Sequence, residues 1–131
     1  MIYHTRAHAG AALAAAEALG CPVVLLTPPG GHAYLGAAYL KRAAESAAAR
    51  HPGAAYDLVL DCGRDAAAAL DAMRRGWRRV LFTGPAGARA KLAEAGGGCG
   101  VEVLTRPPPA LDLLGRADPP GACRAWLSEP D

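Results

Sequence analysis

Short apolar runs alternate with longer alanine-rich segments along most of the chain. There are four apolar runs, at residues 22–27, 56–61, 79–83 and 101–105. A glycine stands a few positions before each of them. The segments between them place apolar residues on one helical face, and they cover residues 8–19, 33–50, 65–75 and 86–95. Runs that are apolar almost throughout are typical of strands covered on both faces. The pattern therefore predicts four strands with helices between them, the last helix ending at the glycines 96–98.

Strands that alternate with helices pair in parallel, because each helix returns the chain to the start of the next strand through a right-handed crossover. The chain has 131 residues, 52% of them apolar, which is enough for one core. We expect a single-domain α/β fold with a mostly parallel sheet of four or five strands flanked by helices, residues 2–5 being the candidate fifth strand. An open sheet of the Rossmann or flavodoxin kind fits this pattern, and half of a (βα)8 barrel is the alternative.

The pattern changes after Arg106. Three consecutive prolines follow at 107–109, and two more stand at 119–120. Proline removes a backbone donor and interrupts both helices and strands. We expect residues 1–106 to form the α/β domain and residues 107–131 to form a proline-rich C-terminal tail that packs on it.

Charge and cysteine usage narrow the partners and the compartment. The formal net charge is only +2, the arginines are scattered and few residues are aromatic, which does not favour a nucleic-acid partner. No apolar run approaches the length of a membrane span, and the first residues lack the pattern of a signal peptide. The four cysteines are far apart with no CxxC pair. We therefore expect free thiols, a cytoplasmic location and no membrane partner.

Polar and glycine-containing turns follow the predicted strands. Ligands of open parallel sheets bind beyond the carboxyl ends of the strands, and the helix N-termini there attract anions. We expect a site for a small, anionic ligand at this edge, formed by Thr27, Gly30, Gly31, Asp61, Gly63, Thr83, Gly84 and Arg106. The turns contain no GxGxxG fingerprint and no P-loop lysine, so no nucleotide cofactor is expected.

Cys62 suggests an alternative chemistry at the same edge. A cysteine just before a helix can serve as a nucleophile, with His4 or His32 as its base. The adjacent Asp61, itself a candidate proton or ligand residue, would raise the thiol pKa, and a buried apolar role for Cys62 is the simpler interpretation. We also expect Asp61 to accept amide hydrogen bonds from the start of the following helix. His4 and His8 are four residues apart, but no carboxylate is near them in sequence, and no metal site is expected.

Three functional hypotheses remain open at this point. The first is a small-molecule or anion-binding domain, the second a structural or oligomerising domain without a ligand, and the third a cysteine-dependent enzyme using Cys62. A short sheet with few charges and many small helix faces leaves apolar surface that a second copy can cover, so a homodimer is expected.

A resemblance adds to this picture. The phrase Leu60-Asp61-Cys62-Gly63, the segment 69–76 and Arg106-Pro107-Pro108 resemble small uncharacterised bacterial α/β proteins. The repeated strand–helix units of residues 20–115 are also similar to part of the phosphate-binding barrel enzymes. The resemblance implies the fold and assigns no activity.

Overall fold

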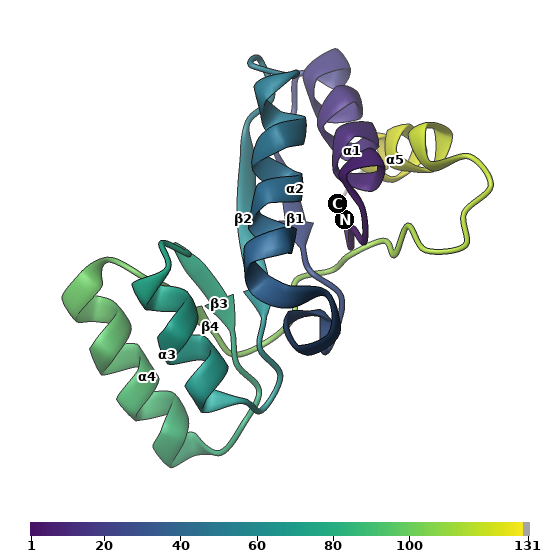
Figure 1. Cartoon of the computed structure of the whole chain (residues 1–131). Helices are drawn as coiled ribbons and strands as arrows, with labels where there is room; N and C mark the ends of the chain where they lie inside the picture. Colours follow the sequence, from purple (N-terminus) through teal and green to yellow (C-terminus); the bar gives the residue numbers. More distant parts are fainter. Residues whose placement is uncertain (130–131) are drawn as a thin grey trace.

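The computed structural model describes residues 1–129 and contains one parallel four-stranded sheet (Figure 1). Every neighbouring pair of strands is parallel. This confirms the predicted single-domain α/β fold, and the strands coincide with the four apolar runs: β1 Val23–Leu26, β2 Tyr56–Asp61, β3 Arg79–Leu81 and β4 Glu102–Leu104.

The strands follow one another across the sheet in chain order, β1-β2-β3-β4. Right-handed crossovers between successive neighbours place their helices on one face. Figure 1 shows that face, covered by α1 (Arg6–Leu19), α2 (Ala37–Ala49), α3 (Ala66–Arg74) and α4 (Ala86–Cys99). Doubly wound sheets reverse their strand order at a switch point, where a ligand crevice opens. The four described strands follow chain order without such a reversal.

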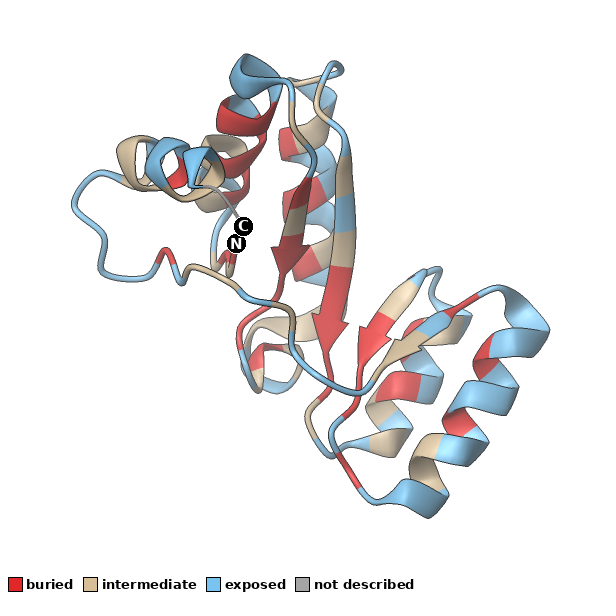
Figure 2. Ribbon diagram, turned by 180° about the vertical axis from the view of Figure 1, so that it is seen from behind, coloured by how far each residue is buried: buried red, intermediate tan, exposed pale blue. Residues whose placement is uncertain are grey.

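Side chains along each strand alternate between the two faces of the sheet. Leu25, Leu60 and Val80 belong to the main core beneath the helices. The neighbouring Leu26, Val59 and Leu81 form a smaller cluster on the opposite face, against Ala110. Figure 2 shows the segment after β4 crossing this second face. Both faces are therefore apolar toward the strand ends, but the crossover helices cover only one of them.

The N-terminal segment lies between β1 and the chain that follows β4. Ile2 forms single parallel bridges to Leu26 and to Asp112. The chain turns into α1 directly afterwards, because Thr5 accepts the backbone N–H of His8 at 3.1 Å and caps the helix. Residues 2–5 therefore contribute one bridging residue in place of a fifth strand.

The segment after β4 returns to the N-terminal half of the molecule. Leu113 is fully buried, and its backbone N–H donates to Ile2 O at 3.0 Å. A fifth helix, α5 (Pro119–Ser128), then packs against α1 and buries Cys123. Residues 130–131 of the predicted tail lie outside the described residues.

Two helices differ from the prediction. The glycines 96–98 do not end α4, which continues to Cys99 and is capped by Gly100 in the left-handed conformation with φ 73°. Gly96 is needed for close packing, because a Cβ there would lie 2.6 Å from Val101 O. The predicted helix over 33–50 is divided into a π-helix, η1 (His32–Gly36), and α2, with Gly36 at φ 89° between them. No helix among residues 1–129 has the length and apolar character needed to span a membrane.

Candidate functional site

The edge predicted to bind a ligand is organised by Thr27 and Asp61. Thr27 Oγ1 accepts the backbone N–H of Asp61 at 2.8 Å, and Asp61 Oδ1 accepts the backbone N–H of Gly63 at 2.9 Å. Both side chains are buried, Thr27 completely and Asp61 to 8% exposure. Each therefore satisfies a backbone amide that would otherwise be left without a partner inside the protein.

His32 and Asp65 complete this part of the edge. Nδ1 of His32 lies 3.2 Å from Asp61 O, and its Nε2 lies 3.4 Å from Asp65 Oδ2. Asp65 also caps α3 by accepting the backbone N–H of Ala68 at 3.0 Å. The hydrogen bond from Ala68, followed by the contact with His32, lowers the pKa of Asp65. The expectation that Asp61 caps this helix is thus wrong: the chain needs a further turn after β2, and Asp65 occupies the cap.

The remaining predicted edge residues shape the turns. Thr83 donates its backbone N–H to Gly63 O at 2.8 Å, which joins the turns after β2 and β3. Gly84 is buried, and a Cβ at this position would lie 2.3 Å from the Phe82 ring, so a larger residue does not fit. Arg106 is exposed, and its side chain makes no hydrogen bond or ion pair with any residue of 1–129.

Gly30 and Gly31 form the turn that precedes η1. Gly30 has φ 73°, a conformation that favours glycine. Gly31 is buried, and a Cβ there would lie 2.7 Å from Pro28 Cγ. These two glycines are accounted for by the path of the chain.

Cys62 is completely buried at this edge, with Sγ 3.8 Å from Leu60 O. Burial, followed by the nearby charges of Asp61 and Asp65, raises the pKa of its thiol to about 12. His4 is engaged elsewhere, with Nε2 2.8 Å from Asp112 Oδ1. Among the hydrogen bonds of residues 1–129, none joins Cys62 to a histidine. The geometry therefore gives the nucleophile hypothesis no support.

The charge of the edge does not favour an anion. Asp61 and Asp65 place two carboxylates there, and His32 is the side chain that pairs with one of them. Like charges disfavour a further negative group in the same place. The part of the chain that the structure describes also contains no group of three or more acidic, histidine or cysteine side chains placed to hold a metal ion.

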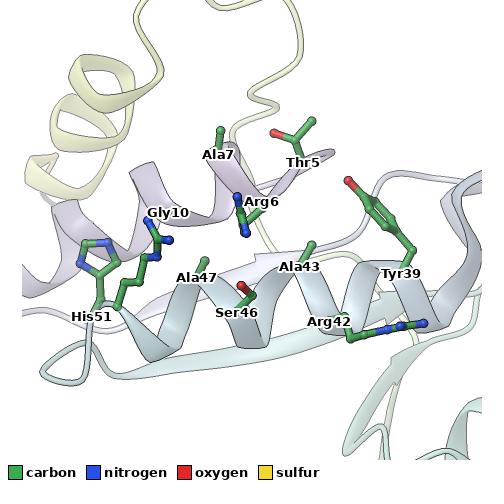
Figure 3. A pocket seen from close by; sticks show the side chains of 11 residues that line it. Thr5, Arg6, Ala7, Gly10, Tyr39, Arg42, Ala43, Ser46, Ala47 and His51 are labelled. Atoms are coloured by element: carbon green, nitrogen blue, oxygen red, sulfur yellow. The ribbon is translucent and has the colours of Figure 1, made fainter.

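A different hollow lies on the outer side of α1 and α2. We call it the α1–α2 groove; it has a volume of about 1020 Å³ (Figure 3). Small residues from both helices form its floor: Ala7, Gly10, Ala43 and Ala47. Larger side chains at these four positions would fill the space, so the alanine-rich composition of the two helices creates the groove.

Four basic side chains line this groove. Arg6 is the first residue of α1, Arg42 belongs to α2, and Arg50 and His51 directly follow the end of α2. The three arginines form no ion pair and no side-chain hydrogen bond among residues 1–129. None of the described residues lining the groove is acidic. Uncompensated charges of one sign along a cleft attract a ligand of the opposite sign.

Hydroxyl groups supplement the basic side chains. Thr5, Tyr39 and Ser46 line the same groove. Figure 3 shows the Arg6 side chain beside α1, above Ser46 in this view, and the hydroxyl of Tyr39 directed toward the side of Thr5. Hydroxyls can donate to anionic oxygens, so both helices contribute donors.

One carboxylate stands near the His51 end, and it is already engaged. Glu17 Oε2 accepts the backbone N–H of Gly53 at 2.9 Å. Its other oxygen lies 3.5 Å from His51 Nδ1 and orients that ring. Glu17 therefore fixes the end of the groove and leaves the three arginines uncompensated.

Arg106, the arginine that the sequence predicted for the ligand site, does not line the groove. Arg42 and Arg50 were not predicted as site residues, because arginine is common in this chain and its arginines are scattered along the sequence. The available signal is the spacing Arg42, Ser46, Arg50, which places three polar side chains along one side of a helix. Comparison of the chain with protein-family models, curated proteins and solved structures found no significant match.

Proposed function

We propose that this protein is a binding domain for a small organic anion and that the anion lies in the α1–α2 groove. The observation that carries the proposal is the set of three arginines, Arg6, Arg42 and Arg50, without acidic partners above an apolar floor. The sequence also predicted an anionic ligand, but at the edge of the sheet; we propose that it binds in the groove instead. The resemblance to phosphate-binding barrel enzymes belongs to the same proposal, with phosphate as one acceptable group.

The chemistry of the lining fits a carboxylate or a phosphate. A guanidinium presents a planar fork of N–H donors that matches two oxygens of either group. Ser46 and Tyr39 add neutral donors beside the arginines. The floor of Ala43 and Ala47 offers no polar side chain, so it suits an apolar part of the same ligand.

The edge of the sheet remains a second location for a ligand. A π-helix often marks a functional position, and η1 presents His32 between Asp61 and Asp65. Such a site would use His32 and would favour a neutral or cationic ligand over an anion. The His32→Gln variant tests this location beside the groove.

The experiment is a calorimetric titration with octylphosphonate as the probe. We expect binding to the wild-type protein, weakened by added salt as screening reduces the attraction. The double variant Arg42→Gln/Arg50→Gln should bind at least tenfold more weakly. The matched control, Arg74→Gln/Arg124→Gln, removes the same charge outside the groove and should bind like the wild type.

Two outcomes would contradict the proposal. Unchanged affinity in the Arg42→Gln/Arg50→Gln protein would remove the groove as the site. Loss of affinity in His32→Gln alone would move the ligand to the sheet edge. Circular dichroism of each variant establishes that the fold is intact.

The expected homodimer and cytoplasmic location also stay proposals. Tyr34 and Leu114 are each 64% exposed and supply apolar surface for a second copy. A monomeric mass in light scattering at micromolar concentration would contradict the homodimer, and with it the alternative of an oligomerising domain.

A further inference from the structure

We infer that the ligand of the α1–α2 groove is an elongated dianion, with a phosphate-type group at one end, an apolar body and a carboxylate at the other. The inference rests on the proposed function, because it concerns the same groove. It goes further in assigning a different acidic group to each end of the groove.

The basic side chains are distributed toward two ends. Arg42 on α2 and Arg50, the residue that caps its C-terminus, are eight residues apart, which separates their backbone positions by about 12 Å along the helix axis. Figure 3 shows Arg42 extending away from the end at which His51 lies. Because Arg42 extends away from the His51 end, a small anion bound beside Arg50 cannot also contact Arg42 closely, so two acidic groups are needed to use both arginines.

The two ends differ in their donors. Arg50 and His51 are adjacent in sequence at one end, and Figure 3 shows Arg6 above Ser46, closer in this view to His51 than Arg42 is. Three nitrogen-bearing side chains suit a phosphate-type group, which has three acceptor oxygens and up to two charges. We call this the Arg50 end.

The other end, which we call the Arg42 end, has a single cation. Arg42 and Tyr39 both come from the first half of α2, and Figure 3 shows the Arg42 guanidinium and the Tyr39 hydroxyl directed to different sides. One guanidinium is sufficient to bind a carboxylate through two parallel hydrogen bonds. The Arg42 end therefore suits a carboxylate.

The floor between the ends suits an uncharged chain. Ala43 and Ala47 face the groove there, and both are buried by the surrounding structure. A flexible methylene chain covers such a surface without leaving a polar group unpaired. The ligand class is therefore a carboxylic acid with a phosphate or phosphonate at the far end of its chain.

Two probes separate this inference from the proposed function. Octylphosphonate carries the phosphate-type group alone, and ω-phosphono-octanoate carries the same chain with a terminal carboxylate. We expect the second to bind the wild-type protein at least tenfold more tightly in calorimetric titrations. Arg42→Gln should remove that advantage and leave octylphosphonate binding unchanged, whereas Arg50→Gln should weaken both probes.

The outcomes are distinguishable. If octylphosphonate binds and the terminal carboxylate adds nothing, the dianion inference is overturned while the proposed function stands. If neither probe binds, the proposed function itself fails. If Arg42→Gln weakens octylphosphonate as much as ω-phosphono-octanoate, the assignment of groups to the two ends is wrong. Arg124→Gln is the charge-matched control and should leave both affinities unchanged.

Discussion

The hydroxyl of Thr27 accepts the backbone N–H of Asp61 at 2.8 Å, between the ends of β1 and β2, where both residues are buried. The backbone N–H of Thr27 in turn donates to Val59 O at 3.1 Å. Thr27 thus continues the pairing of the two strands with its side chain after the regular ladder ends. This contact explains a polar residue after an apolar strand without invoking a ligand.

The first prediction concerns this hydroxyl. Thr27→Val keeps the shape of the side chain but leaves the buried N–H of Asp61 without an acceptor, which should lower the free energy of unfolding by about 1–3 kcal/mol. Thr27→Ser is the matched control, because it keeps the acceptor and loses only a methyl group, worth about 1 kcal/mol. Urea denaturation measures both. Equal stability of Thr27→Val and the wild type would show that the hydrogen bond is dispensable.

The second prediction concerns the cap of α3. Asp65→Ala should lower the free energy of unfolding by about 1 kcal/mol, whereas Asn caps nearly as well as Asp. The pKa of Asp65 lies below its ordinary value of 3.8, so the charged form stabilises the fold above that pH. This stabilisation should be lost as the pH falls below 3.8 through the lowered pKa.

Thermal melts of the wild type and Asp65→Asn at neutral pH and below pH 3.8 test the titration. The difference between the two proteins should change with pH, because Asn does not titrate. A difference that is the same at both pH values would exclude the proposed contribution of the carboxylate.

The third prediction uses consecutive glycines in α4. Gly96→Ala should destabilise the protein by about 1–3 kcal/mol, because the new Cβ would lie 2.6 Å from Val101 O and the backbone must move. Gly97→Ala has no atom within 4 Å of its Cβ and should stabilise the helix by about 0.5–1 kcal/mol. Chemical denaturation of the two variants should therefore give opposite signs. Stabilisation by both would mean that α4 does not pack closely on Val101.

The fourth prediction concerns thiol reactivity. Cys62 is buried with a pKa raised from 9.0 to about 12, whereas Cys99 is exposed. Iodoacetamide at mildly alkaline pH should modify Cys99 readily and Cys62 only after unfolding, because the thiolate is the reactive form. Mass spectrometry of the modified peptides measures both rates. Reaction of Cys62 as fast as that of Cys99 in the folded protein would restore the nucleophile hypothesis.

The same pKa shift predicts a stability change in alkali. A thiol that ionises at 9.0 in the unfolded chain and at about 12 in the folded protein favours folding only while it is protonated. Its contribution is complete below pH 9.0 and is lost as the pH rises toward 12. Cys62→Ala should reduce the loss of stability over this range, as measured by urea denaturation at each pH.

Local pattern determined much of the fold. The apolar runs have the length of strands, and the alanine-rich segments between them have the spacing of helices. Both patterns depend only on neighbouring residues, and the four strands lie at the apolar runs. The crossover rule then turned that alternation into a parallel sheet without further information. Gly20 likewise ends α1 in the left-handed conformation, as its position after a helical segment predicts.

Contacts between distant residues decided the rest. Gly96 lies within α4 because of its approach to Val101, which no local propensity reveals. The bridge between Ile2 and Asp112 joins two segments that are far apart in the sequence, so it depends on the path of the chain after β4. In the same way, Asp65 and not Asp61 caps α3, because the Asp61 side chain accepts the N–H of Gly63 in the turn between β2 and α3.

The candidate site shows the same division. The sequence by itself determined that several polar turns meet at the carboxyl ends of the strands, because parallel pairing brings those ends together. Only the tertiary structure placed Arg6 beside the arginines of α2, since 36 residues separate Arg6 from Arg42 and their proximity depends on how α1 packs on α2. Charge is read from the sequence, but whether a charge has a partner depends on its surroundings in space.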